Sequence, residues 1–288
     1  MAVSVVVVGD ALLDVLAIPW EPILPGADVR AAVSVAPGGQ GANLAVRLAR
    51  RGVAVELACA LGVDAAGRLL RETLAVDGIR LRPLVADATG AVIVLVDDDG
   101  ERTMLSRRVP LAGQLPAAPS EPADWLVVSG YLLLEADAGG AAAASLRDWA
   151  PRRMLVGCAV PDASLDAWRR AARALEPDVV VLNREEADRT PSLFDDRLVV
   201  TEAGSASAAI GAARAAAVTP AGPPAIDTTG AGDAFAAAFL AELLDAWPPD
   251  EDALRRALEA GTASGAAATR VTGAQGRIPG ERSAMVEP

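Results

Sequence analysis

Short, continuous runs of apolar, mostly β-branched residues recur along the chain and constrain its fold more than any other feature. The first run spans residues 3–8, and comparable runs follow at residues 53–61, 126–129, 154–159, 179–182 and 198–201. Such runs are typical of strands that are buried on both faces of a parallel sheet. The intervening stretches predict helices at residues 42–51, 65–76, 142–149, 165–175 and 184–188. This alternation predicts an α/β fold, a three-layer sandwich in which a mostly parallel central sheet lies between helices.

Two segments interrupt this alternation and predict a small β-lid. Residues 91–96 and 102–107 read as a hairpin joined through Asp99-Gly100, and residues 29–35 follow a proline-rich stretch as a further strand. We therefore expect one domain over residues 1–288, with lid segments at about 19–36 and 88–110. Ligands of such folds bind at the carboxyl ends of the parallel strands.

The absence of lysine and histidine limits the chemistry that the chain can perform. All 26 basic residues are arginine. Without histidine there is no Ser-His-Asp triad and no HExxH zinc site, and without lysine there is no Schiff base and no Walker A loop. Catalysis must therefore use carboxylates, hydroxyls, arginine, backbone amides and metal ions.

Net charge and hydropathy limit the classes of partner and predict the location of the protein. The net charge is −12, and a field of that sign repels nucleic acids and anionic membranes, so neither is expected as a partner. Cys59 and Cys158 lie in apolar runs and read as buried free thiols. No basic segment precedes the first apolar run and no run approaches membrane-spanning length, so the sequence predicts a cytoplasmic protein.

The stretch Asp227-Thr-Thr-Gly-Ala-Gly-Asp-Ala-Phe235 predicts an anion site at the start of a helix. Apolar residues then recur every four positions until Pro248-Pro249, which predicts about four helical turns. The first amides of a helix lack intrahelical partners and carry the positive end of its dipole. Gly230 and Gly232 allow close approach to this backbone, so an anion can bind without lysine.

Asp233 has two interpretations at this site. A carboxylate beside an anion site can accept a proton from a substrate hydroxyl while nearby amides stabilise a moving phosphoryl group. The alternative is a helix-capping aspartate. Residues 37–43, Pro-Gly-Gly-Gln-Gly-Ala-Asn, open another helix, where Asn43 can donate and accept hydrogen bonds. Glycine-rich turns of this kind are also ordinary connectors.

Taken together, these two stretches resemble the two signatures of the ribokinase-like (PfkB) carbohydrate kinase family. Their order and their separation of about 190 residues agree with that family. The run Asn183-Arg-Glu-Glu186 resembles the family's N-x-x-E motif, and Gly273-Ala-Gln275 lies where the family has a similar run. The resemblance covers almost the whole chain and implies the ribokinase-like version of the predicted fold.

The resemblance implies roles for particular residues. Asp233 resembles the general base, and the amides of Gly230, Ala231 and Gly232 resemble the anion hole. Other positions resemble the sugar contacts, namely Asp14, Gly38, Gly39 and Asn43. Asn183 and Glu186 resemble the pair that organises Mg²⁺ through water together with the ATP phosphates, and Thr201 and Gly204 resemble the nucleotide loop in a form one residue longer. Asp227 and Thr229 match positions that hold a monovalent cation such as K⁺ in many members.

We therefore expect an ATP-dependent phosphotransferase that acts on a primary hydroxyl of a small sugar of the ribose, fructose or sugar-acid type. Gln40 stands where ribokinases usually have lysine, which argues against ribose. Arg107 and Arg108 either reach an acidic substrate group or form a solvated basic pair. The first alternative is an adenosine-type nucleoside kinase, in which Trp20 is the candidate for an aromatic wall against the base. The second is a catalytically silent sugar or nucleotide sensor. The resemblance also implies a homodimer that forms through the lid.

Overall fold

The computed structural model describes residues 4–96, 102–111, 113–119, 122–190, 193–202, 204–218 and 222–282. Its central sheet has nine strands in the order β13-β12-β11-β10-β9-β8-β1-β4-β5. The strands are β1 (Ser4–Val8), β4 (Ala54–Gly62), β5 (Arg80–Ala86), β8 (Trp125–Ser129), β9 (Arg152–Val156), β10 (Val179–Asn183), β11 (Arg197–Glu202), β12 (Ser205–Ile210) and β13 (Ala213–Val218). All neighbours pair in parallel except β11 with β12 and β12 with β13. The predicted mostly parallel sheet is confirmed.

Strand β1 shows why the central strands consist of continuous apolar runs. Val5 and Val7 join the core on one face of the sheet, and Val6 and Val8 join the core on the other face. Successive side chains of a strand point to opposite faces, so a strand covered on both sides has no position for a polar residue.

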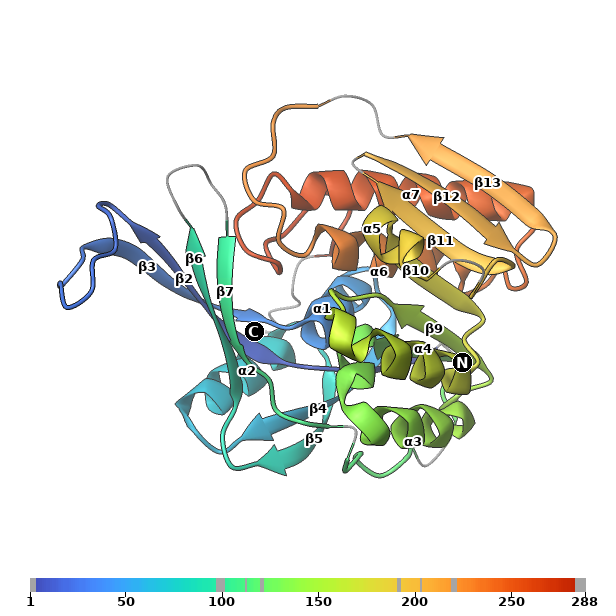
Figure 1. The fold of residues 1–288 in the computed structure, drawn as a ribbon. Coiled ribbons are helices and arrows are strands. Elements are labelled where there is room, and N and C mark those ends of the chain that lie inside the picture. Colours follow the sequence, from blue (N-terminus) through green and yellow to red (C-terminus); the bar gives the residue numbers. More distant parts are fainter. Residues whose placement is uncertain are drawn as a thin grey trace, which may run out of the picture.

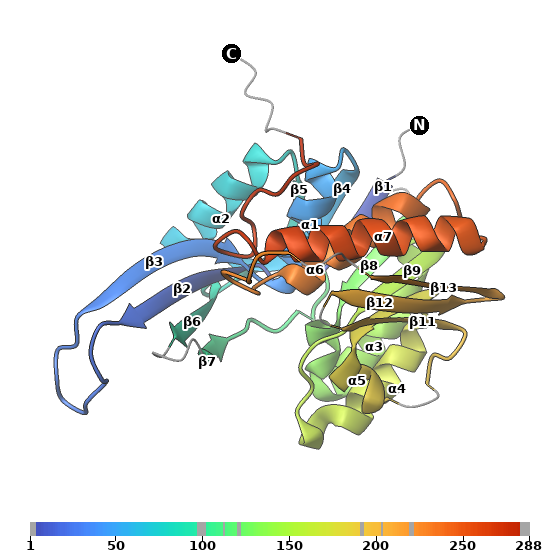
Figure 2. The same cartoon turned by 90° about the horizontal axis from the view of Figure 1, so that it is seen from above.

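Helices cover both faces of the sheet and complete the three layers (Figure 1). The core on one face contains residues of α1 (Gln40–Arg50), α2 (Ala65–Val76), α6 (Ala231–Leu243) and α7 (Glu251–Ala268). The other core contains residues of α3 (Ala136–Leu146), α4 (Leu165–Leu175) and α5 (Arg184–Asp188). Figure 2 shows α7 and α1 above the sheet and α3, α4 and α5 below it.

A second, four-stranded sheet projects from the body as the lid (Figure 1). Its order is β3-β2-β6-β7, from strands β2 (Leu12–Pro19), β3 (Ala31–Gly38), β6 (Gly90–Val96) and β7 (Arg102–Arg107). Only residues 9–11 separate β1 of the body from β2 of the lid. The lid therefore includes a strand that begins at Leu12, seven residues before the first predicted lid segment. The predicted Asp99-Gly100 turn lies outside the described residues.

The remaining differences from the sequence prediction have local physical causes. Strands β5, β12 and β13 were not predicted because none of them is buried on both faces and because they include arginine, serine and alanine. Helix α6 ends at Leu243 rather than near Trp247, whose ring instead packs edge-on against Trp125 at a centroid distance of 4.9 Å. Helix α3 begins six residues before the predicted start.

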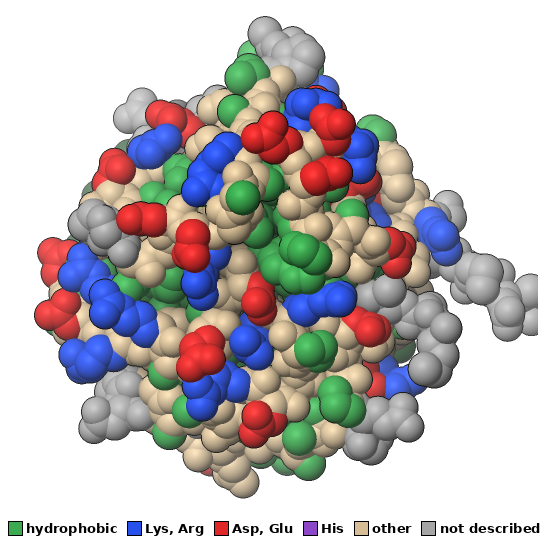
Figure 3. Space-filling model, turned by 90° about the vertical axis from the view of Figure 1, so that its right-hand side faces the viewer, with side chains coloured by type: hydrophobic (Ala, Val, Ile, Leu, Met, Phe, Trp, Pro, Cys, Tyr) green, Lys and Arg blue, Asp and Glu red, His purple; other side chains and the backbone are tan. Residues whose placement is uncertain are grey.

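The face turned away from the lid carries interspersed charges of both signs around a hydrophobic group (Figure 3). Because positive and negative side chains are interspersed there, this face does not present a large field of a single sign. No helix in the described part of the chain is long and apolar enough to cross a membrane.

Candidate active site

The predicted site residues gather where the carboxyl ends of the parallel strands meet the lid. Strands β1, β10 and β11 end at Val8, Asn183 and Glu202, and each is followed at once by site residues or their neighbours. Helices α1 and α6 begin at the same edge and contact each other. This is the edge where open α/β sheets bind ligands.

Asp233 lies in the first turn of α6 but does not cap the helix. The N-cap residue is Gly230, and no side chain makes a capping hydrogen bond at this end. The Asp233 carboxylate instead accepts a hydrogen bond of 2.8 Å from the side-chain amide of Asn43 on α1, and its residue is only 9% exposed. The capping interpretation is therefore wrong for this residue. The two glycine-rich helix starts, 190 residues apart in sequence, meet at this bond.

Burial raises the pKa of Asp233 to about 6, although hydrogen bonds from Asn43 and Gln40 and the charge of Arg47 act in the opposite direction. A carboxylate with such a pKa is ionised at neutral pH and is still basic enough to take a proton. Burial also raises the pKa of Asp14 to about 6. The charge of Asp14 is a minor contribution to the raised pKa of Asp233.

The carboxylate of Asp14, on the lid, packs against the backbone of the neighbouring strand. It lies on β2 opposite Ala36 of β3, and a Cβ added to Gly38 would overlap its carboxylate. Gly39 adopts a φ of 92°, and a Cβ there would lie 2.7 Å from the Asp10 carbonyl oxygen. The glycines at 38 and 39 thus serve close approach of the backbone to Asp14 and to the end of β1.

The glycine-rich loop before α6 has one constrained and one open glycine. Gly230 has a φ of 74°, and an added Cβ would lie 2.8 Å from the Cα atom of Ala274. An added Cβ at Gly232 would meet nothing within 4 Å. Gly230 therefore shapes the loop, while Gly232 leaves open space over the first turn of the helix. The Ala231 amide lies 3.3 Å from the Thr228 carbonyl oxygen within the same loop.

Asp227 joins this loop to the C-terminal segment. Its two carboxylate oxygens accept hydrogen bonds of 2.9 Å from the amides of Thr229 and Gly273. The amides of Ile226 and Asp227 both donate to the Thr269 carbonyl oxygen. The predicted cation positions at Asp227 and Thr229 therefore lie beside the Gly273 loop, where backbone and carboxylate oxygens can converge.

Asn183 and Glu186 form a capping box at the start of α5. The Asn183 side chain accepts from the Glu186 amide at 2.8 Å, and the Glu186 carboxylate accepts from the Asn183 amide at 3.0 Å. Burial raises the pKa of Glu186. Thr201 is the register partner of Asn183 on β11, and Gly204 lies exposed at the following hairpin turn with a φ of 76°. The predicted nucleotide residues thus lie together at the carboxyl ends of β10 and β11.

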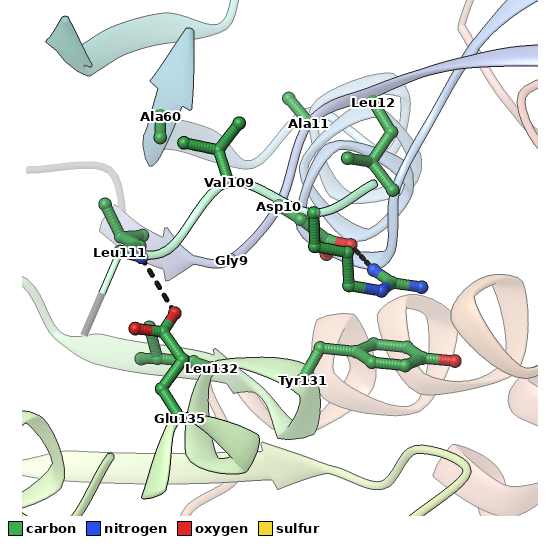
Figure 4. A pocket seen from close by; sticks show the side chains of 11 residues that line it. Gly9, Asp10, Ala11, Leu12, Ala60, Val109, Leu111, Tyr131, Leu132 and Glu135 are labelled. Atoms are coloured by element: carbon green, nitrogen blue, oxygen red, sulfur yellow. Dashed lines mark hydrogen bonds and ion pairs between the residues drawn. The ribbon is translucent and has the colours of Figure 1, made fainter. Parts of the chain in front are cut away.

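A pocket beside the lid contains a cluster that the sequence did not single out as a unit (Figure 4). Arg108 forms an ion pair with Asp10, and its guanidinium carbon lies 3.6 Å from the centroid of the Tyr131 ring. Burial lowers the pKa of Arg108 and raises the pKa of Tyr131. The side chain of Arg108 is 31% exposed and ion-paired, whereas Arg107 is exposed, so the two arginines do not form a uniformly solvated pair.

Three further residues of the site were missed or left without a role. Gln40 donates to the Gly157 carbonyl oxygen at 2.8 Å and accepts from the Ser129 hydroxyl at 2.6 Å. Gln275 donates to the side-chain oxygen of Asn43 at 3.0 Å. Arg47, 1% exposed, lies one turn after Asn43 on α1 and ion-pairs with Glu281 at 2.8 Å. The sequence signal for Arg47 was an arginine four residues after Asn43 on an apolar helix face.

Comparison with solved structures defines the class of protein. The fold superposes on fructokinase with bound ATP from Xylella fastidiosa with a TM-score of 0.75 and 22% sequence identity, covering 94% of each chain. The ribokinase-like fold predicted from the sequence is confirmed.

Comparison of sequences then identifies the family. The model of the pfkB family carbohydrate kinases matches residues 3–280, so the chain belongs to this family. The chain is 30% identical to a fructokinase of Salmonella typhimurium, over 98% of both chains. It is 32% identical to an ATP-dependent ribose-1-phosphate kinase of Halopiger xanaduensis, over 84% of both chains. The protein is an ATP-dependent sugar kinase.

Proposed function

We propose that this kinase transfers a phosphoryl group from ATP to a primary hydroxyl of a small sugar, with Asp233 as the general base. The observation that carries the proposal is the buried hydrogen bond between Asn43 and Asp233. It joins the two glycine-rich helix starts around a carboxylate whose pKa is about 6. A catalytically silent sensor has no need of such a base.

The site residues divide the work of positioning, proton removal and charge stabilisation. Asp14, Gly38, Gly39 and Asn43 orient the acceptor from the lid and from α1. Asp233 takes the proton of the attacking hydroxyl, which contributes about 10²–10⁴ in rate. The amides of Gly230, Ala231 and Gly232 stabilise the moving phosphoryl group at the positive end of α6. A lid closed over this space excludes the water that would otherwise hydrolyse ATP.

The residues present fit two kinds of cation. Asn183 and Glu186 offer an amide and a carboxylate oxygen, the hard donors through which Mg²⁺ is held with its waters and substrate phosphates. When bound there, Mg²⁺ neutralises charge on the ATP phosphates. Asp227 and Thr229, with the loop at Gly273, would hold K⁺. Thr201 and Gly204 lie on the nucleotide side of this arrangement.

Fructose is the acceptor that we propose first, because the relative aligned over the whole chain is named a fructokinase. Arg108 in its half-buried pocket also suits a sugar that carries a carboxylate or phosphate group. A nucleoside is less well supported, because Trp20 is 66% exposed and the Tyr131 face is already covered by Arg108.

The test is a panel of acceptors assayed for ADP release with Mg²⁺, with and without K⁺. The panel contains fructose, ribose, ribose 1-phosphate, a 2-keto-3-deoxy sugar acid and adenosine. Phosphorylation of fructose is expected. Heat stabilisation by a sugar without ADP release would instead support the sensor. The variant Arg108→Gln separates the acceptor classes, because it should lower kcat/KM at least tenfold more for an anionic acceptor than for a neutral one.

We also propose that residues 1–288 act as one kinase domain that forms a homodimer through its lid. The exposed side chains Val33, Val35, Met104 and Leu105 make the lid apolar on its surface. Light scattering after gel filtration should give twice the mass of 29.3 kDa. Charged substitutions at Val33 and Leu105 should reduce it to the monomer mass.

A further inference from the structure

Gln275 is buried beside the proposed base, and its own packing does not explain its presence there. The residue is 9% exposed, and its side-chain oxygen is buried without a hydrogen-bond partner within the described part of the chain. An unpartnered buried amide oxygen is less favourable than an apolar group of the same shape. The side-chain nitrogen makes one hydrogen bond, which goes to the Asn43 oxygen at 3.0 Å.

A second hydrogen bond connects Asn43 to Asp233, so Gln275 is linked to Asp233 through Asn43. An ionised carboxylate only accepts hydrogen bonds, so Asn43 must turn its nitrogen toward Asp233. The Asn43 oxygen then faces Gln275, which must present its own nitrogen. The distances of 3.0 Å from Gln275 to Asn43 and 2.8 Å from Asn43 to Asp233 agree with both hydrogen bonds.

The backbone around Gln275 is fixed by the same helix that carries Asn43. Arg50 of α1 donates to the Gln275 carbonyl oxygen at 2.6 Å, and Arg47 donates to the Ala274 carbonyl oxygen at 2.7 Å. Three residues of α1 spaced along one face therefore contact residues 274–275. This loop also lies against Gly230, whose added Cβ would meet Ala274.

We propose that Gln275 is a positioning residue that fixes the orientation of the Asn43 amide and thereby the ionisation and direction of the Asp233 carboxylate. The inference rests on the proposed role of Asp233 as the base. Without the Gln275 nitrogen, Asn43 can rotate, and the hydrogen bond that lowers the pKa of Asp233 weakens. The acidic limb of the pH profile of kcat should then move to higher pH.

Two variants and two matched controls test this role. Gln275→Met removes the donor and adds no charge, whereas Gln275→Glu replaces the donor with a group that only accepts and so draws the Asn43 nitrogen away from Asp233. We expect the acidic limb to rise by about half a pH unit in Gln275→Met and by about one unit or more in Gln275→Glu. At high pH, kcat should stay about three- to tenfold below wild type, with the KM for ATP within about twofold. Gln114→Met and Gln114→Glu make the same changes at an exposed glutamine and should leave the profile unchanged.

An acidic limb in Gln275→Met that coincides with wild type would overturn the proposal, whatever happens to thermal stability. A shift in Gln275→Glu alone would also overturn it, because a new negative charge then explains the effect. If Gln275→Met does not fold, Gln275→Leu, which also removes the donor, replaces it: the acidic limb should again rise by about half a pH unit, and an unshifted limb would overturn the proposal. Wild-type protein that phosphorylates no acceptor in the panel contradicts the proposed function itself and is distinguishable from these results.

Discussion

Replacing Asp233 with asparagine should greatly slow turnover and at the same time stabilise the fold. Asparagine has the same shape and can still accept the Asn43 hydrogen bond, so the packing is retained. Loss of the base should lower kcat by about 10²–10⁴. Burial raises the pKa of Asp233 from 3.8 to about 6, so the folded state binds the proton more tightly than the unfolded state. The stability that this proton provides is therefore present below pH 4 and is lost as the pH rises through 6.

The shift of about two units corresponds to about 3 kcal/mol of destabilisation at pH 8, as an upper bound, and to about half of that at pH 5. The free energy of unfolding of Asp233→Asn should exceed that of wild type by this amount at pH 8, and the gain should shrink toward pH 5. Urea unfolding at both pH values measures it, with Asp28→Asn at an exposed lid position as the control for the removed charge. Equal stability of Asp233→Asn and wild type at pH 8 would show that Asp233 is not the desolvated carboxylate described here.

Four other substitutions test separate parts of the structure. Gly230→Ala should destabilise the fold by about 1–3 kcal/mol, because its φ is positive and its Cβ meets Ala274, whereas Gly232→Ala should leave the melting temperature unchanged and lower kcat about tenfold. Both are measured by thermal unfolding and initial rates, and equal melting temperatures would refute the distinction. Glu186→Gln keeps an acceptor for the capping box but should raise the Mg²⁺ concentration for half-maximal activity about tenfold. The control Glu185→Gln, at an exposed position, should not change it. An unchanged Mg²⁺ dependence of Glu186→Gln would show that Glu186 only caps the helix. Arg50→Met should cost about 1–3 kcal/mol in urea unfolding, because the Asp77 carboxylate, 3% exposed, loses its 2.9 Å partner and keeps only the 3.5 Å contact with Arg277. Unchanged stability of Arg50→Met would contradict this.

Much of the body could be predicted from the sequence because strands buried on both faces leave an unbroken apolar run. Helix α5 lies at residues 184–188 as predicted, and β1 and β10 begin or end within one residue of the predicted bounds. Strands β12 and β13 escaped prediction because they form one edge of the sheet, where serine, alanine and arginine are tolerated on the exposed side. Strand β2 escaped because its lid positions are half-buried and include Asp14.

The site was predictable where glycine and a carboxylate share a short motif, and less so where contacts join distant segments. Asn43 and Asp233 were singled out separately, and their hydrogen bond follows only from the packing of α1 against α6. The sequence could not decide the role of Arg108, because the exposure of an arginine that follows a lid strand depends on whether an aromatic ring such as Tyr131 packs against it. The unpartnered oxygen of Gln275 has no counterpart in any sequence pattern.

The three residues between β1 and β2 place Asp14 on the lid and leave the end of β1 on the body. We expect that a tilt of the lid on acceptor binding would change the distance between Asp14 and Asp233, which lies on α6 of the body. Trp20 directly follows the last residue of β2 and is 66% exposed. Its fluorescence emission should shift to shorter wavelength when an acceptor brings the lid down, before any nucleotide is added.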